Sequence, residues 1–384
     1  MKKAAIITST RAEYGLLVPL IQKVEADLEL ELSLIVTGGH LSEKQGYTID
    51  EIRKDGFPIA HEIPILEEGN TPYEISLTIA NAVRGFADCF CKDRPDIAVI
   101  LGDRTEMLGA ASAAMIEKIP IAHIHGGEIT KGAVDDCVRH ALTKMSYLHF
   151  TSTEIYRKRV IQLGEEPKRV FCVGALGAEN VMRTPLIDEK DIRRDIGISQ
   201  TSPYIVVTFH PATLDDVSAE QQADELCRAM EKKSRFFFLI TKANADAGGD
   251  AVNRLFYEFT RKHVNTKLVS SLGRIRYLSA VKYAVCVLGN SSSGILEAPV
   301  IGTPSVNIGD RQTGRIMADS VICCEPQTEQ IVRALDKAEK MEHRRQNLYG
   351  DGKTSDRIVK IIREYLIGEK INLKKEFYDI YKTL

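Results

Sequence analysis

Short apolar segments alternate with longer amphipathic segments along most of the chain. The apolar segments are residues 4–8, 32–36, 97–101, 121–124, 148–151, 170–173, 204–208, 236–240, 285–288, 304–308 and 321–323. The amphipathic segments include residues 75–90, 106–117, 220–232, 250–261 and 329–341. Because strands that are buried on both faces belong to parallel sheets covered by helices, this alternation predicts an α/β fold.

The number of predicted strands indicates more than one domain. Two successive sets of five or six strands, in a chain of 384 residues, predict two Rossmann-like, doubly wound parallel-sheet domains. We expect an N-terminal domain over residues 1–175 and a C-terminal domain over 176–355, with a hinge in residues 174–184. A final helix and tail, residues 356–384, are expected to pack back on the first domain.

Composition narrows the function classes. Charged residues make up 27% of the chain, the formal net charge is −2, and basic and acidic residues are mixed, which disfavours a nucleic-acid partner. No apolar run approaches the length of a membrane helix, so no membrane partner is expected. The eight cysteines lack zinc-type spacing, so free thiols and a reducing, cytoplasmic location are expected.

In open parallel sheets, ligands bind beyond the carboxyl ends of the strands. In the first half, three strand-to-helix loops are polar or rich in glycine, and they carry Arg11, His40, and Asp103 with Arg104. Arginine and hydroxyl groups at a helix start suit an anion, and two glycines beside His40 allow close approach of a ligand. The structural alternatives are a capping box completed by Glu13, a surface histidine and a buried ion pair.

A fourth loop, residues 123–140, gathers three histidines, a glutamate and two aspartates. General acid–base chemistry by His125, Glu128 and Asp135 is the interpretation that we favour. A metal site is the alternative, because the same residue types bind metal ions. Asp135 and Asp136 also suit the N-cap of the following helix.

The second half offers a different set of groups. Its clearest motif is Gly289 to Gly294, where three serines precede a helix and form a cradle for an anion such as a diphosphate. A serine-rich helix cap is the alternative. Neither a Walker loop nor a dinucleotide fingerprint is present, which disfavours nicotinamide and flavin cofactors. The candidate residues here are His210, Asn244, Asn290, Ser291, Ser292, Glu297 and Arg311.

Six ordered motifs together resemble the UDP-N-acetylglucosamine 2-epimerase family. They are residues 9–14, 102–104, 123–128, 209–211, 289–294 and 309–312. The Gly-Asp-Arg and Gly-Gly-Glu forms look like the hydrolysing branch of that family, the enzyme of the sialic acid pathway. The resemblance implies a GT-B arrangement of the two domains, with the active site in the cleft between them.

The resemblance also implies a reaction. UDP leaves C1 of the sugar as the C2 proton is lost, giving a 2-acetamidoglucal; water then adds at C1 and a proton returns to C2 on the opposite face. The products are N-acetylmannosamine and UDP, with no cofactor and no metal. The catalytic candidates are Asp103, Glu128, His125, Asp135 and His210; the binding candidates are Arg11, His40, Arg104, Asn244, Asn290, Ser291, Ser292, Glu297 and Arg311.

The exact substrate and the acid–base residue stay open at this point. Many members of the family carry glutamate where this chain has His125, so either Glu128 or His125 takes that role. The substrate is alternatively a UDP- or GDP-linked 2,4-diacetamido-2,4,6-trideoxyglucose, on the way to legionaminic acid. A non-hydrolysing epimerase, a GT-B glycosyltransferase and a sugar-nucleotide sensor also fit parts of the pattern. We expect a homodimer or a homotetramer.

Overall fold

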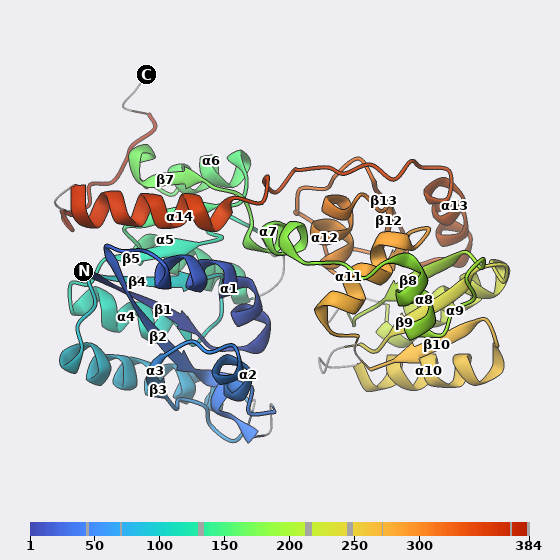
Figure 1. Cartoon of the computed structure of the whole chain (residues 1–384), viewed down its shortest axis with the longest axis horizontal. Coiled ribbons are helices and arrows are strands. Elements are labelled where there is room, and N and C mark those ends of the chain that lie inside the picture. The colour runs from blue at the N-terminus through green and yellow to red at the C-terminus, as the bar shows by residue number, and fades with distance from the viewer. Residues whose placement is uncertain are drawn as a thin grey trace. The chain divides into compact units, whose positions relative to one another are not determined.

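The computed structural model forms two compact units (Figure 1). It describes residues 1–43, 46–69, 71–129, 134–211, 217–243, 249–270, 272–368 and 371–381. The first unit comprises Met1–Asn180 and Tyr349–Leu384, and the second comprises Val181–Leu348. The expected borders were residues 175 and 355. The border after Asn180 falls within the segment expected to be a hinge, residues 174–184, most of which forms the helix α7 (Leu176–Arg183).

The first unit is built on a seven-stranded parallel sheet of order β3-β2-β1-β4-β5-β6-β7. The strands are β1 (Lys2–Thr8), β2 (Leu30–Thr37), β3 (Ile59–Ile63), β4 (Ile97–Leu101), β5 (Ile121–Ile124), β6 (Leu148–Thr151) and β7 (Val170–Cys172). Strand β3 was not predicted. It lies at the edge of the sheet and only partly buries its side chains, so it lacks the continuous apolar run that marked the other strands.

Both faces of this sheet are buried against helices. The helices of the unit are α1 (Arg11–Glu25), α2 (Ile49–Lys54), α3 (Pro72–Lys92), α4 (Met107–Ile116), α5 (Val134–Met145), α6 (Glu154–Gln162), α7 in part and α14 (Thr354–Arg363). On β1, Ala4 and Ile6 face one core with Leu17 of α1, whereas Ala5 and Ile7 face another. Alternate residues of one strand therefore serve two cores, which explains why the strand is apolar throughout.

Helix α14 belongs to the first unit, although the second unit precedes it in the chain (Figure 1). Ile358 and Ile362 join the core that contains α1. At the start of the helix, the buried Glu179 carboxylate accepts hydrogen bonds from the backbone nitrogen and Oγ of Ser355, both at 2.6 Å. These contacts fix the returning chain on the first unit.

The second unit repeats the design with a six-stranded parallel sheet of order β10-β9-β8-β11-β12-β13. The strands are β8 (Tyr204–Thr208), β9 (Phe237–Thr241), β10 (Thr266–Val269), β11 (Val287–Gly289), β12 (Ser305–Ile308) and β13 (Val321–Cys324). The helices are α8 (Glu189–Ile196), α9 (Ala219–Lys232), α10 (Gly249–Lys262), α11 (Gly273–Tyr283), α12 (Ser293–Ile301) and α13 (Thr328–Ala338). Like β3, the unpredicted β10 is a half-buried edge strand. The prediction of two parallel-sheet α/β domains is confirmed.

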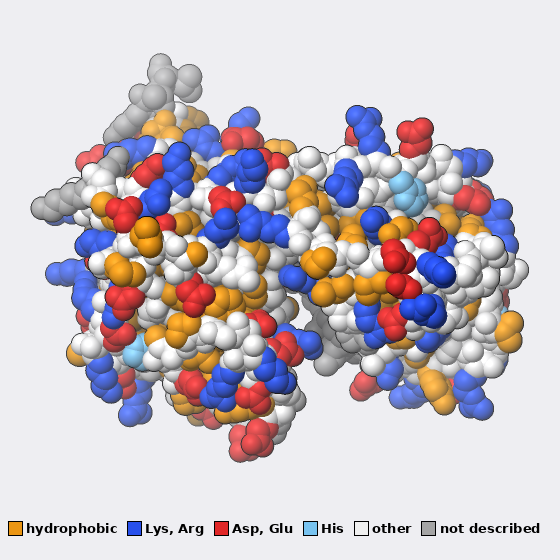
Figure 2. All heavy atoms as spheres, viewed as in Figure 1, with side chains coloured by type: hydrophobic (Ala, Val, Ile, Leu, Met, Phe, Trp, Pro, Cys, Tyr) orange, Lys and Arg blue, Asp and Glu red, His pale blue; other side chains and the backbone are white. Residues whose placement is uncertain are grey.

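The surface carries both signs of charge. Figure 2 shows basic and acidic side chains interspersed over the visible face, without a large field of one sign. Within the described ranges, no helix combines the length and the apolar character needed to cross a bilayer.

Candidate active site

Four neighbouring strands of the first sheet, β2, β1, β4 and β5, end in polar loops at the same edge. This edge is the carboxyl end of the parallel strands, where α/β proteins bind ligands. Four of the predicted site residues, Arg11, His40, Asp103 and Arg104, lie on the first three loops. His125 and Glu128 follow β5, and Asp135 lies in the first turn of α5.

A buried guanidinium group organises the carboxylates at this edge. Arg139 of α5 is 4% exposed, and its Nη2 forms a short ion pair with Asp103. Its Nη1 lies 3.6 Å from Asp136 Oδ1. Burial, and after it the charge of Asp103, raises the pKa of Asp135. Asp103 is thus a carboxylate held by a cation, and Asp135 is a carboxyl group that holds a proton more readily than usual.

Arg104 makes a second charged pair beside the first. Its Nε forms a short hydrogen bond with Glu106, which is 2% exposed. Partial burial opposes the charge of Arg104, whose side chain is still 48% exposed, but the charges of Glu106, Glu13 and Asp135 raise its pKa. Glu106 therefore positions Arg104 at the sheet edge.

His125 and Glu128 lie close together after β5. His125 Nδ1 is 3.7 Å from Glu128 Oε1, and the same oxygen accepts a 3.0 Å hydrogen bond from Ser152 Oγ. His125 adopts a left-handed backbone conformation (φ 66°), which is uncommon for a residue with a side chain and is found at turns and functional sites. Its backbone nitrogen donates to Phe150 O at 2.8 Å, which anchors the turn.

Two of the expected binding residues have different surroundings. His40 is 0% exposed, and its ring nitrogens lie 3.1 Å from Thr8 Oγ1 and 2.8 Å from Thr48 Oγ1. Burial lowers the pKa of His40 to about 4, so its ring is neutral at physiological pH. This arrangement places the His40 ring in the interior, bonded to Thr8 and Thr48. Arg11, in contrast, is exposed and pairs with Glu51 at 3.0 Å.

In the second unit, Asn290 joins three loops. The strands β8, β11 and β12 are neighbours, so the segments after them meet at one edge. Asn290 is 1% exposed; its Oδ1 accepts from the His210 backbone nitrogen at 2.7 Å and its Nδ2 donates to His210 O at 2.8 Å. Its own carbonyl accepts from Gln312 Nε2 at 2.9 Å and from Arg311 Nη1 at 3.3 Å. Asn290 therefore positions His210 and Arg311, and its side chain is engaged by the protein.

The serine loop leads into α12. Ser291 and Ser292 are half-buried, and Ser292 occupies the N-cap position without a capping hydrogen bond from its side chain. The third serine, Ser293, donates a short hydrogen bond to Glu297 and accepts one from Tyr277 OH at 2.9 Å. Burial raises the pKa of Glu297. The loop thus offers two hydroxyl groups at a helix start, where an anion is stabilised.

Gly289 shows why this loop begins with glycine. Its φ is +137°, and a Cβ there would lie 2.0 Å from Thr208 O on the neighbouring strand. A side chain would push β11 away from β8, and the serine loop would lose its place.

Asn244 lies outside the described residues. Among the residues that the structure does describe, no three His, Cys, Asp or Glu side chains gather as ligands of a metal ion. Of the three histidines in the fourth loop, His123 is a structural residue: its Nε2 lies 2.7 Å from Gly102 O, and burial lowers its pKa to about 3.

Arg139, Glu106 and Gln312 were not among the site residues predicted from the sequence. Arg139 follows Asp135 and Asp136 by one helical turn, so helical spacing would have placed it on the same face. Glu106 and Gln312 are close to predicted residues in the chain, but only the folded structure shows which atoms they engage.

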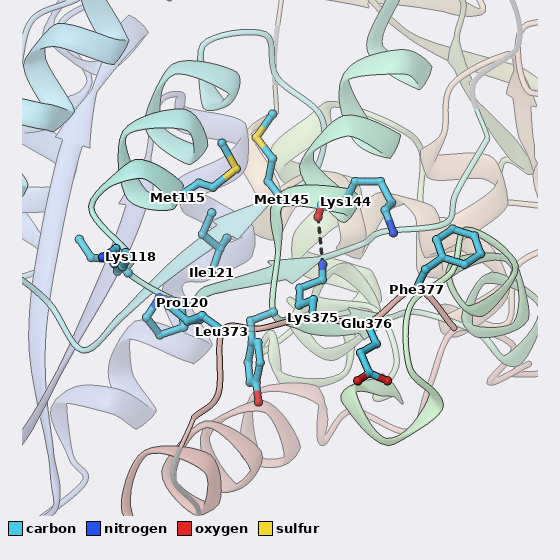
Figure 3. Close-up of a pocket in the computed structure, with 12 residues that line it drawn as sticks. Met115, Lys118, Pro120, Ile121, Lys144, Met145, Leu373, Lys375, Glu376 and Phe377 are labelled. Carbon is cyan, nitrogen blue, oxygen red and sulfur yellow. Dashed lines mark hydrogen bonds between the residues drawn. The ribbon is translucent and has the colours of Figure 1, made fainter. Parts of the chain in front are cut away.

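A cavity of about 490 Å³ opens at the opposite edge of the first sheet (Figure 3). It is lined by residues around the amino end of β5, such as Pro120 and Ile121, and by the tail residues Leu373 and Phe377. Lys375 crosses it and donates to Lys144 O at 2.9 Å. None of the predicted site residues lines this cavity, so its size does not identify it as the reaction site.

Comparison with known proteins agrees with the chemistry of the two edges. Residues 22–363 match the family model described as UDP-N-acetylglucosamine 2-epimerase. The chain is 39% identical over 342 residues to a GDP/UDP-N,N'-diacetylbacillosamine 2-epimerase (hydrolyzing) from Campylobacter jejuni, covering 89% of this chain and 88% of that protein. It is also 38% identical over 386 residues to polysialic acid biosynthesis protein P7 from Escherichia coli. That alignment covers 99% of this chain and 98% of that protein.

The fold has solved counterparts as well. The crystal structure of UDP-GlcNAc 2-epimerase from Neisseria meningitidis, bound to UDP-GlcNAc, superposes with a TM-score of 0.82 and 18% identity. It covers 95% of this chain and 100% of that one. At this identity the likeness supports the fold, whereas the family model and the two relatives define the family. The chain belongs to the UDP-N-acetylglucosamine 2-epimerase family.

Proposed function

We propose that the protein is a hydrolysing UDP-sugar 2-epimerase that converts UDP-N-acetylglucosamine and water to N-acetylmannosamine and UDP. The observation that carries the proposal is the group of carboxylates at the edge of the first sheet. Asp103 is paired with the buried Arg139, Asp135 has a raised pKa, and Glu128 lies beside His125. A glycosyltransferase has less need of such a group.

The chemistry of the reaction explains why these groups are useful. When the C1–O bond breaks, the sugar ring gains positive character, which a fixed carboxylate such as Asp103 stabilises. The C2 proton becomes acidic enough to remove only as that bond breaks, so the base acts in the same step. Since the proton leaves one face and returns to the other, two groups are needed. Asp135 and the His125–Glu128 pair are the two that we assign.

The second unit supplies the groups that suit the leaving UDP. Ser291 and Ser292 stand at the start of α12, where the helix dipole favours negative charge. His210 and Arg311 are held in place through Asn290. We assign the diphosphate to these four residues and the ribose to Glu297, whose carboxylate Ser293 orients.

A second substrate is favoured by one specific observation. The Campylobacter jejuni relative is named for N,N'-diacetylbacillosamine, which is a 2,4-diacetamido-2,4,6-trideoxyglucose. The Escherichia coli relative is instead named for polysialic acid biosynthesis, which fits N-acetylmannosamine as the product and a role in sialic acid formation. The two substrates differ at C4 and C6, so direct competition distinguishes them.

Proton NMR of the protein in deuterated water tests the proposal. We expect UDP-N-acetylglucosamine to give UDP and a free manno-configured sugar that carries deuterium at C2. The same experiment with the UDP-linked diacetamido sugar compares kcat/KM for the two substrates. Formation of UDP-N-acetylmannosamine without free sugar would instead indicate a non-hydrolysing enzyme, and turnover only with an acceptor would indicate a transferase.

We further propose that the protein is a homo-oligomer with an even number of subunits. Exposed apolar side chains on two helices of the first unit support this: Tyr73 of α3 is 72% exposed and Ile116 of α4 is 73% exposed. Helix α4 carries no charged residue, which is unusual for a helix with an exposed end. Light scattering on the purified protein measures the subunit number; a monomer at micromolar concentration would contradict the proposal.

A further inference from the structure

Glu13 is a buried carboxyl group that the proposed mechanism does not use. It lies in the first turn of α1 and is 6% exposed. The backbone nitrogen and Oγ of Ser9 both donate to its Oε2, at 2.8 Å and 3.0 Å. The other oxygen, Oε1, is buried and has no hydrogen-bond partner among the described residues. The capping box expected with Thr10 is therefore only half formed: Thr10 Oγ1 accepts from the Glu13 backbone nitrogen at 3.4 Å, but the Glu13 carboxylate binds Ser9 instead of the Thr10 backbone.

The charges that face Glu13 come from the turn after β4. The charges of Glu106 and Arg104 act on Glu13, and the charge of Asp135 acts on Arg104. Three carboxyl groups therefore influence one guanidinium group, whose Nε is bonded to Glu106. From the next loop, His40 donates its backbone N–H to Ser9 O at 3.3 Å, and its ring is neutral because burial lowers its pKa.

This geometry favours a proton on Glu13. An ionised carboxylate with one unbonded, buried oxygen loses its hydration without compensation. Burial raises the pKa of Glu13 to about 7; the hydrogen bonds from Ser9 oppose this, and the charge of Glu106 adds to it. In the structure Arg104 is bonded to Glu106, and an ionised Glu13 would add a second carboxylate charge acting on the same guanidinium group.

We propose that Glu13 is a positioning residue, whose neutral carboxyl group keeps Arg104 paired with Glu106 at the substrate-binding edge and whose ionisation draws Arg104 away. The consequence for turnover rests on the function proposed above. The proton itself does not, so the two can be tested separately.

The first experiment compares pH profiles of kcat/KM for UDP-N-acetylglucosamine between pH 5.5 and 9. In the unmodified protein we expect an alkaline limb that begins close to pH 7 and falls about tenfold for each further pH unit. Glu13→Gln mimics the neutral acid, so it should retain most of the activity seen at pH 6 and lose this limb. Glu74→Gln is the matched control, because Glu74 is also a first-turn glutamate, bonded to Thr71 at the exposed start of α3, and should keep the limb. An identical limb in Glu13→Gln would overturn the proposal.

The second experiment does not need turnover. Infrared difference spectra between pH 6 and pH 8 should show the C=O band of a protonated carboxyl group disappearing in the unmodified protein, and this band should be missing in Glu13→Gln. If substrate is not converted but this band titrates and depends on Glu13, the proposed function fails while the protonated Glu13 stands. A spectrum unchanged by Glu13→Gln would overturn the inference even in an active enzyme.

Discussion

The two units share one architecture and differ in the chemistry at the carboxyl edges of their sheets. In the first unit the edge carries charged side chains in pairs that each have one buried member, such as Arg139 with Asp103 and Arg104 with Glu106. In the second unit the corresponding edge is built from hydroxyl, amide and backbone groups, held together by Asn290. The same scaffold thus supports proton chemistry in one unit and anion binding in the other, because only the loops differ.

The largest effect should come from Asp103→Asn. The amide keeps the shape of the side chain but removes the charge that stabilises the sugar as UDP departs, so we expect kcat to fall by about 10³-fold. UDP affinity should stay within about threefold, because we assign UDP to the second unit. Rapid-mix kinetics and calorimetry with UDP measure the two quantities.

Asp88→Asn is the control for this change, since Asp88 is an exposed aspartate on α3. If Asp103→Asn lost UDP affinity to the same degree as turnover, the result would contradict the assignment of UDP binding to the second unit alone.

Arg139→Met should destabilise the first unit by about 3 kcal/mol, because it leaves Asp103 without its buried partner. Hydrogen exchange that is resolved by peptide should show the loss in β4, β5 and α5 and leave the sheet of the second unit protected. Equal loss of protection in both units would show that their stabilities are coupled, and would weaken the comparison.

Ser292→Ala should weaken UDP binding by about 1–3 kcal/mol and leave the C2 exchange of bound sugar nearly unchanged. Ser218→Ala offers a control, because Ser218 is an N-cap serine of the same unit, at the start of α9. Unchanged UDP affinity in Ser292→Ala would mean that the serine loop is only a helix start.

The smallest effect concerns acid stability. His40 is neutral in the folded first unit, with a pKa of about 4, whereas in the unfolded chain a histidine titrates near 6.5. Between these values the unfolded chain binds more protons, so the stability that His40 contributes at neutral pH is lost as the pH falls through this window.

We therefore expect the gap in melting temperature between the unmodified protein and His40→Gln to narrow from pH 7.5 to pH 4.5. His263→Gln in the second unit is the control variant, because His263 is partly exposed and its substitution leaves the buried His40 ring in place. A constant gap for His40→Gln would contradict the neutral, buried assignment.

Much of the fold followed from the sequence pattern, for a physical reason. The strands at residues 97–101, 121–124, 148–151 and 204–208 were predicted with their observed bounds, because central parallel strands are apolar on both faces. Strands β3 and β10 were missed because their sequences, IAHEI and TKLV, contain polar residues that break the apolar run, whereas the edge strands β7 and β13 are apolar throughout.

The site was predictable as a set of loops, but not as a set of contacts. Loop position placed Asp103 and Asp135 at one sheet edge, and it also made candidates of His40 and Asn290. The roles of the last two depend on partners elsewhere in the chain, Thr48 and His210, which no local pattern reveals. The pairing of Arg139 with Asp103 and the proton on Glu13 likewise follow from burial, which only the folded structure provides.

The path of the chain sets an order for biosynthesis. Because α14 packs on α1 and Ser355 binds Glu179, the first unit gains its last helix only after residues 181–348 have left the ribosome. The second unit is continuous in sequence and can fold once residue 348 has been synthesised. The first unit cannot complete the core around α1 until α14 has been synthesised. A stop codon just before residue 349 would therefore leave the second unit complete, but it would remove α14 from the first unit and expose part of that unit's core.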